Sequence, residues 1–214
     1  MLYYLLKFLL LPIFKLFWIG EVEGLENIPK KEKGGFIFAS NHQSFFDFLV
    51  LVGVSPRRIY FLTGEVFFEK WPWWSWLVNL TGQIKIVRYG DEKERKESAI
   101  KAKKRAIELL LQGKVIGIYP EGTRSRTGKL QKARGVGVAY LALAAKVPIV
   151  PVGMIGTYQI MSPYDHIPKI KKCKIRIGEP LNFSKYYSQE NDRKVLKKIN
   201  KEVMTQIGEL IGKI

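Results

Sequence analysis

The sequence predicts an α/β layered domain, a single domain in which helices flank a mostly parallel or mixed sheet. Short apolar runs typical of strands alternate with segments of helical periodicity along the chain, and this order is typical of such folds. The length of 214 residues suits one substantial domain, and a hydrophobic content of 47% suffices for its core. The chain shows no internal repeat and no low-complexity block.

The predicted strands are short apolar runs bounded by turn residues. After a short strand that begins near residue 21, they comprise residues 36–39, 58–62, 82–88, 115–119, 147–152 and 169–177. The two prolines of residues 147–152 indicate an edge strand or an irregular pairing. The alternating lysines of residues 169–177 are typical of a protected edge.

The predicted helices carry apolar residues at helical spacing. They comprise residues 48–54, with a start near Phe45, and residues 91–111, 135–146 and 192–214. The apolar stripe of the long second helix is predicted to contain Ile100, Ile107, Leu110 and Leu111.

The formal net charge of +17 favours anionic partners, such as nucleic acid, anionic lipid surfaces or acidic proteins. No recognisable nucleic-acid-binding module is present, and such a function would leave the apolar N-terminus unexplained, so no nucleic-acid partner is expected. Cys173 is the single cysteine, which excludes an internal disulfide and fits a reducing cytoplasmic setting. His166 is the only histidine besides His42, and no metal site is expected.

Residues 1–19 are apolar except for Lys7, Lys15 and the interruption at Pro12. No small-residue cleavage site follows them, so a secretory signal peptide is not expected. A lysine within a membrane span costs about 3 kcal/mol, which favours a helix lying in the membrane interface over a true span or a buried core helix. The side chains expected to contact the membrane are Leu5, Phe8, Leu9, Phe14 and Phe17.

Four of the five tryptophans fall within six positions, at Trp71, Trp73, Trp74 and Trp76. A solvated loop would not carry these side chains. They form either an interfacial aromatic belt or the wall of an apolar pocket, and membrane contact is the favoured interpretation.

The strongest chemical signal is the stretch Asn-His-Gln-Ser-Phe-Phe-Asp of residues 41–47, between a predicted strand and a predicted helix. His42 is a candidate general base and Asp47 its orienting partner. Ser44 and Asp47 also have the spacing of a capping box, which lets Asp47 serve both roles. A covalent role for Ser44 is the less favoured alternative, and backbone amides at the helix start are the simplest oxyanion donors.

Two further segments offer groups that bind phosphate. Arg88 ends a predicted strand, where ligands of open α/β sheets collect. After another predicted strand the chain continues with Glu121, Gly122, Thr123 and Arg124. An arginine fork and backbone amides near a glycine are suited to an anion.

With these motifs, the chain resembles the glycerolipid acyltransferases, and among them most closely the lysophosphatidic acid acyltransferases. His42-x4-Asp47, Gly82-x-Ile84-x-Ile86-x-Arg88, Pro120-Glu-Gly-Thr-Arg124 and Val147-Pro-Ile-Val-Pro151 are similar to the four motifs of the family in order and spacing. The likeness covers about Val22 to Val152. The chain departs from many members at Lys85, where they carry an aromatic residue, and at Thr63-Gly64-Glu65, which lacks their lysines.

The resemblance implies transfer of a fatty acyl group from acyl-CoA or acyl carrier protein to the sn-2 hydroxyl of lysophosphatidic acid, which yields phosphatidic acid. His42 and Asp47 would be catalytic, Arg88 and the loop of Glu121, Gly122, Thr123 and Arg124 would bind the substrate phosphate, and no cofactor is implied beyond the acyl donor. Residues 1–19 would form the membrane-associating segment and residues 20–214 the catalytic domain, on the cytoplasmic face of a bacterial inner membrane. The alternatives are another lysolipid acceptor, ester or thioester hydrolysis, and a basic peripheral membrane protein without catalysis.

Overall fold

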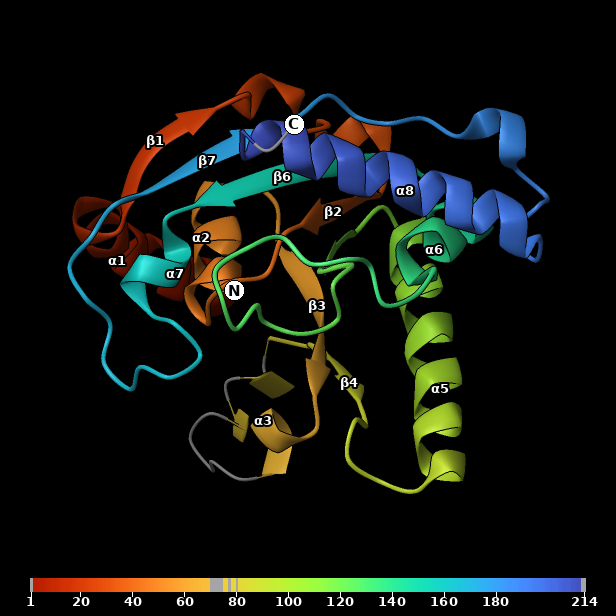
Figure 1. Ribbon diagram of the computed structural model, residues 1–214, viewed down its shortest axis with the longest axis horizontal. Helices are drawn as coiled ribbons and strands as arrows, with labels where there is room; N and C mark the ends of the chain where they lie inside the picture. The colour runs from red at the N-terminus through yellow and green to blue at the C-terminus, as the bar shows by residue number, and fades with distance from the viewer. Residues whose placement is uncertain (1, 70–74, 77, 80, 213–214) are drawn as a thin grey trace.

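The computed structural model describes residues 2–69, 75–76, 78–79 and 81–212. Within these residues the chain forms one seven-stranded sheet with helices on both faces (Figure 1). The strands are β1 (Ile19–Glu23), β2 (Phe36–Ser40), β3 (Ile59–Gly64), β4 (Ile84–Ile86), β5 (Val115–Ile118), β6 (Ile149–Ile155) and β7 (Cys173–Ile177). The α-helices are α1 (Leu2–Phe17), α2 (Phe46–Val54), α3 (Val66–Glu69), α5 (Glu92–Leu111), α6 (Gly137–Ala145), α7 (Thr157–Ile160) and α8 (Arg193–Leu210), with short 3-10 turns η1 (Leu25–Asn27), η2 (Lys31–Lys33) and η3 (Ser184–Tyr186).

The strand order is β1-β7-β6-β2-β5-β3-β4. The five strands from β6 to β4 run parallel, β7 is antiparallel to β6, and β1 is parallel to β7. This arrangement confirms the prediction of a mostly parallel, mixed sheet. Ala39 of β2 pairs with Ile118 of the neighbouring β5, so the loops that follow these two strands leave the same edge side by side.

The edge position predicted for residues 169–177 was wrong, because β7 lies inside the sheet, and of the two interpretations of residues 147–152 the edge strand was wrong as well. Pro148 precedes β6, and the antiparallel ladder with β7 begins at Val152, one residue after Pro151. The prolines are therefore placed where β6 needs no amide for that ladder. The observed edges of the sheet are β1 and β4.

The basic residues of β7 have partners on the neighbouring strand. Lys174 Nζ lies 2.8 Å from a carboxylate oxygen of Glu21 and 2.6 Å from one of Glu23, and Arg176 Nε lies 3.0 Å from Glu23. These cross-strand ion pairs join β7 to β1. The basic residues that suggested an exposed edge therefore belong to β7, a strand that pairs with β1.

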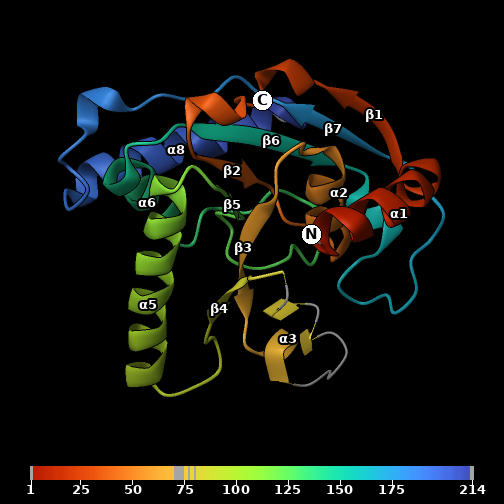
Figure 2. The same ribbon diagram turned by 180° about the vertical axis from the view of Figure 1, so that it is seen from behind.

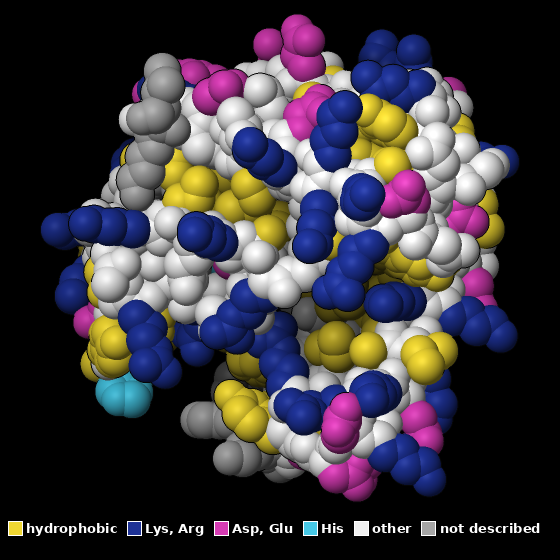
Figure 3. Space-filling view, turned by 45° about the vertical axis from the view of Figure 1, so that its right-hand side comes forward, with side chains coloured by type: hydrophobic (Ala, Val, Ile, Leu, Met, Phe, Trp, Pro, Cys, Tyr) yellow, Lys and Arg dark blue, Asp and Glu magenta, His cyan; other side chains and the backbone are white. Residues whose placement is uncertain are grey.

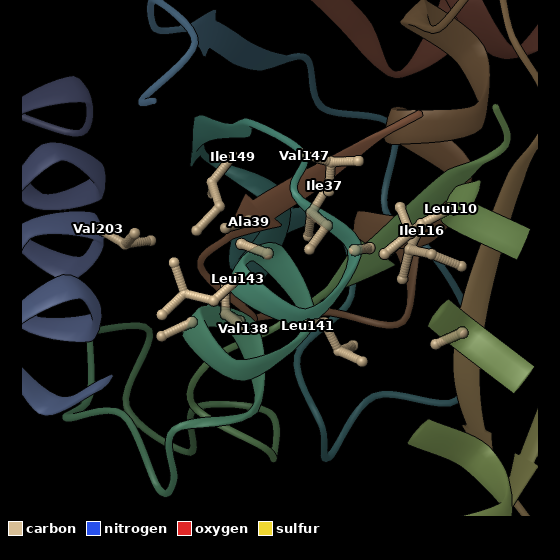
Figure 4. Packing of buried hydrophobic residues seen from close by; sticks show 14 of the residues in the cluster. Ile37, Ala39, Leu110, Ile116, Val138, Leu141, Leu143, Val147, Ile149 and Val203 are labelled. Carbon is tan, nitrogen blue, oxygen red and sulfur yellow. The ribbon is translucent and has the colours of Figure 1, made fainter. Parts of the chain in front are cut away.

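One face of the sheet packs against α5, α6 and α8. Ile37, Ile116 and Ile149 of three adjacent strands meet Leu143 of α6 and Val203 of α8 in this core (Figure 4). The buried face of α5 consists of Ala102, Ala106, Leu109 and Leu110. The stripe predicted for this helix was therefore partly wrong, since Ile100 and Leu111 are exposed. Small alanines at the contact let α5 pack closely beside the buried Leu109 and Leu110, whereas Ile100 and Leu111 face outward.

The other face packs against α1 and α2, which lie in front when the molecule is seen from behind (Figure 2). Phe36 and Phe38 of β2 meet Phe46, Val50 and Leu51 of α2. Side chains of a strand alternate between faces, so β2 sends its phenylalanines to this core and Ile37 to the other. All five residues of β2 are buried, as expected for a central strand.

Helix α1 is anchored on α2. Lys7 Nζ donates to the carbonyl oxygen of Ser55, the residue that caps the C-terminus of α2. Burial, and then repulsion from Lys15, lower the pKa of the Lys7 ammonium. The Phe14 ring stacks on Phe46 with centroids 5.4 Å apart. A cation at a helix C-terminus and a buried aromatic pair thus fix α1 to the domain.

The predicted membrane-contacting side chains divide into three groups. Phe14 is a correction, because it packs inward on Phe46. Phe8, 78% exposed, points outward, as do Leu9, Phe17 and Trp76. The Leu5 side chain and Trp71, Trp73 and Trp74 lie outside the described residues. Among the helices that the structure describes, none combines the length and apolar character required to cross a membrane.

Candidate active site

The loop between β2 and α2 brings His42 and Asp47 together. His42 Nδ1 lies 2.8 Å from Asp47 Oδ2. The Asp47 side chain is fully buried, whereas 19% of the His42 side chain is exposed. Because Asp47 faces Nδ1, the other ring nitrogen of His42 is the one left to meet a substrate.

The same carboxylate oxygen of Asp47, in the first turn of α2, also accepts from backbone amides just before the helix. It accepts hydrogen bonds from the amides of Gln43, at 2.6 Å, and Ser44, at 2.8 Å. The reach of Asp47 back to the Ser44 amide is half of a capping box, and the Ser44 hydroxyl instead accepts from the amide of Phe46 at 3.0 Å. The sequence predicted backbone amides at the start of this helix as the simplest oxyanion donors. That expectation is wrong for Gln43, Ser44 and Phe46, because all three amides already donate hydrogen bonds within the loop.

Side chains on either side of His42 fix the loop to the rest of the domain. The Asn41 amide donates to the carbonyl of Met154 and accepts from its amide, both at 2.8 Å. This two-point contact extends the pairing of β2 with β6 by one residue. The Ser44 hydroxyl donates to the carbonyl of Met161 at 2.6 Å, which leaves it engaged in structure rather than poised as a nucleophile.

Tyr119, at the end of β5, supports the His42 ring. The two rings stack with centroids 3.9 Å apart and planes 10° from parallel, and the Phe61 ring also stacks on Tyr119 with centroids 6.1 Å apart. Burial, and then the charge of Asp47, raise the pKa of the Tyr119 hydroxyl well above its ordinary value, so the phenol stays neutral. Sequence reasoning treated Tyr119 only as a strand residue. Its place directly before the Pro-Glu-Gly-Thr-Arg motif was the available signal.

The Glu121 carboxylate joins the loop after β5 to the loop after β2. One oxygen accepts from the His42 amide at 2.6 Å and the other from the Gln131 amide at 2.8 Å. Glu121 is buried, and desolvation raises the pKa of its carboxyl despite these hydrogen bonds. A buried anion whose two oxygens both face backbone amides cannot hold a phosphate, so the predicted phosphate contact of Glu121 is corrected to a positioning role.

Backbone hydrogen bonds hold the rest of the motif. Gly122 has φ +69°, which favours glycine, and its amide donates to the carbonyl of Tyr119, so this amide is not free for an anion as predicted. The Ser125 amide donates to the carbonyl of His42 at 2.7 Å. Within the described residues, the amides of Thr123 and Arg124 donate no hydrogen bond. Thr123 and Arg124 are partly exposed and lie in the chain between Glu121 and Ser125, which both bond to the backbone of His42.

Arg88 belongs to a different pair of strand ends. The Glu65 carboxylate, after β3, accepts from the amides of Arg88 at 2.9 Å and Tyr89 at 2.7 Å. Burial raises the pKa of Glu65, but these amides and the Arg88 charge outweigh it, so the pKa lies below its ordinary value. β4 lies two strands from β5, or about 10 Å, and the Arg88 side chain is exposed.

A histidine held by a buried carboxylate, beside a basic loop at the carboxyl edge of a sheet, is the arrangement of an enzyme that uses a general base. The family model described as Acyltransferase matches residues 20–155. This match spans more than half of the chain, and the chain therefore belongs to the acyltransferase family. The acyltransferase class expected from the four motifs is confirmed.

Two curated relatives and one solved structure place the chain within the family. It is 30% identical to a 1-acyl-sn-glycerol-3-phosphate acyltransferase of Bacillus subtilis over 76% of this chain and 73% of that protein. It is 30% identical to a chloroplastic enzyme of the same name from Brassica napus, over 68% of this chain but only 40% of the plant protein. The crystal structure of the 1-acyl-sn-glycerophosphate (LPA) acyltransferase PlsC from Thermotoga maritima has a TM-score of 0.71 and 25% identity, covering 97% of this chain and 82% of that one.

The position of Glu121 generates a stability prediction. Glu121→Gln keeps one acceptor but turns an NH2 group toward a backbone N–H, so one buried amide loses its partner. We expect the free energy of unfolding to fall by about 1–3 kcal/mol, measured by urea denaturation. The matched control is Glu97→Gln, an exposed glutamate of α5, which should change little. Equal stability of the two variants would contradict the positioning role.

Proposed function

We propose that the chain transfers a fatty acyl group from an acyl thioester of coenzyme A or acyl carrier protein to the free sn-2 hydroxyl of lysophosphatidic acid, which yields phosphatidic acid. The observation that carries this proposal is the 2.8 Å contact between His42 and the buried Asp47, next to a loop whose arginine is held at the same edge of the sheet. The names of the relatives support the choice of acceptor.

The proposed chemistry needs one proton acceptor near the hydroxyl. As the hydroxyl oxygen attacks the thioester carbonyl carbon, the free ring nitrogen of His42 takes its proton, and Asp47 stabilises the imidazolium through Nδ1. The new carbon–oxygen bond forms, the carbon–sulfur bond breaks, and the proton passes from His42 to the departing sulfur. The stack on Tyr119 keeps the imidazole in one plane throughout.

The proposed phosphate site uses Arg124 and Arg88. The amides of Thr123 and Arg124, which donate no hydrogen bond within the described residues, would donate to a phosphate oxygen. The Arg124 guanidinium would add a charge-assisted, bidentate contact. Arg88 approaches from a strand end about 10 Å from β5, within the combined reach of two arginine side chains. A phosphate held between them would place the neighbouring glycerol hydroxyl near His42.

We also propose that the outer face of α1 rests on the membrane that supplies the acceptor. Among the side chains of α1 that the structure describes, the large exposed apolar ones are Tyr4, Phe8, Leu9, Ile13, Leu16 and Phe17. Three of them, Phe8, Leu9 and Phe17, were predicted from the sequence as membrane contacts. Exposed apolar side chains on a helix that is itself anchored by Lys7 and Phe14 are suited to shallow insertion in the headgroup region.

His42→Ala tests the general base. We expect acyl transfer to lysophosphatidic acid to fall by about 10²- to 10⁴-fold, because the acceptor hydroxyl loses its proton acceptor. Purified protein should be assayed with acyl-CoA and acyl carrier protein donors, and circular dichroism should confirm the fold. The control is His166→Ala, at the exposed second histidine. A His42→Ala variant with near-wild-type turnover would rule out this assignment.

Arg124→Ala tests the phosphate site. The KM for lysophosphatidic acid should rise roughly 10- to 100-fold, the effect of losing one or two charge-assisted hydrogen bonds. The KM for a neutral monoacylglycerol acceptor should stay the same, because it has no phosphate. Arg95→Ala, at an exposed arginine of α5, serves as the control. Equal losses with both acceptors would show that Arg124 does not recognise phosphate.

Phe8→Gln with Leu9→Gln tests the membrane face of α1. Removing two inserted apolar side chains should lower partition into phosphatidylglycerol-containing vesicles by at least about tenfold in a flotation assay. Ile100→Gln with Leu111→Gln is the matched control, because it changes two equally exposed apolar side chains on α5. If both double variants float like the wild type, α1 is not the membrane contact.

A further inference from the structure

A basic groove lies between residues 130–136 and helix α8. Its volume is about 800 Å³, and a second hollow of about 480 Å³ adjoins it, because both are lined by Gly135, Val136 and Arg193. We call the two together the α8 groove. Its size falls in the range of sites for cofactor-sized ligands, about 300–1,000 Å³ for a single pocket.

The lining of the larger hollow is strongly cationic. Its five basic residues are Lys132, Arg134, Arg193, Lys197 and Lys201. Glu209 is the one acidic residue of that lining, and the second hollow adds Lys103 and Glu190, one charge of each sign. On the side of the molecule that shows this region, Lys and Arg side chains surround patches of hydrophobic surface (Figure 3). Such a lining is complementary to a ligand with several negative charges and an apolar portion.

The two walls of the groove are tied together. Asn200 of α8, only 5% exposed, lies among the lining residues, and its Nδ2 donates to the carbonyl of Gly135 on the opposite wall. Because this contact is buried, it fixes α8 to residues 130–136 without a ligand.

One end of the groove reaches the active-site loops. The Gln131 amide, at this end, donates to the same Glu121 carboxylate that accepts from the His42 amide. The Arg134 side chain lies over Gly122, so that a Cβ added there would lie 3.3 Å from Arg134 Cδ. A ligand in the groove would thus lie against the motif that orients His42.

We propose that the α8 groove binds the nucleotide and pantetheine portions of an acyl-CoA donor, an inference that rests on the proposed acyl transfer. The phosphates of coenzyme A match the lysine and arginine lining, and its less polar pantetheine arm matches the apolar lining residues Leu130, Val136 and Met204. A concave, cofactor-sized site suits coenzyme A better than a carrier protein, which would need an interface of about 1,200–2,000 Å². The thioester then extends past Gln131 toward His42.

The test removes two groove charges at exposed positions of α8. In isothermal titration with coenzyme A, Lys197→Gln with Lys201→Gln should raise the Kd about tenfold, the loss expected for two phosphate contacts. The KM for palmitoyl-CoA should rise in parallel, while the KM for lysophosphatidic acid stays unchanged. Lys31→Gln with Lys33→Gln removes the same charge from η2, outside the groove lining, and should change neither value.

The outcomes separate this inference from the proposed function. Wild-type protein that transfers acyl groups but binds no coenzyme A, or a groove variant with wild-type Kd and KM, overturns the groove assignment alone. A groove variant that loses turnover only with acyl carrier protein would assign the groove to an acidic protein partner and likewise overturn it. Wild-type protein that is inactive with both donors would instead refute the proposed acyl transfer, whatever its affinity for coenzyme A.

Discussion

The buried carboxylate of Glu121 is the constraint on which the site depends. It holds the backbone of His42 with one oxygen and that of Gln131 with the other, so the loops after β2 and β5 are fixed to one another. A buried anion is tolerated only where its hydrogen bonds are made, and both loops must therefore be in place together. The parallel register of β2 and β5 is what delivers the two loops to the same edge.

Polar groups in the site serve more than one purpose. Asp47 fixes the His42 ring and also accepts from the amides of Gln43 and Ser44 just before helix α2. These two amides are therefore not available to an oxyanion. The free amides of Thr123 and Arg124 instead lie on the loop after β5. One loop thus orients the histidine and the other carries the proposed acceptor site, and Glu121 is the group that keeps the two loops in register.

Sequence reasoning predicted the fold class and the pairing of His42 with Asp47 because both depend on local patterns: strand and helix periodicity, and a spacing that suits a helix start. The predictions that were wrong concern residues whose environment depends on a partner distant in the sequence. Lys174 and Arg176 of β7 suggested an exposed edge, but the glutamates of β1 pair with them. Phe14 was predicted as a membrane contact, but its ring packs on Phe46. The role of Glu121 likewise depends on two amides that lie 79 and 10 residues away in the sequence.

The two faces of the sheet give the proposed substrates separate routes to His42. Helices α1 and α2 cover one face, and α8 with its groove covers the other. A lysolipid leaves the membrane as an apolar ligand with one phosphate, whereas coenzyme A arrives from water with several charges. An apolar helix and a basic groove on opposite faces suit these two ligands, and both routes end at the carboxyl edge of β2 and β5. The acyl group therefore has to cross only that edge, where Glu121 already holds the two loops together.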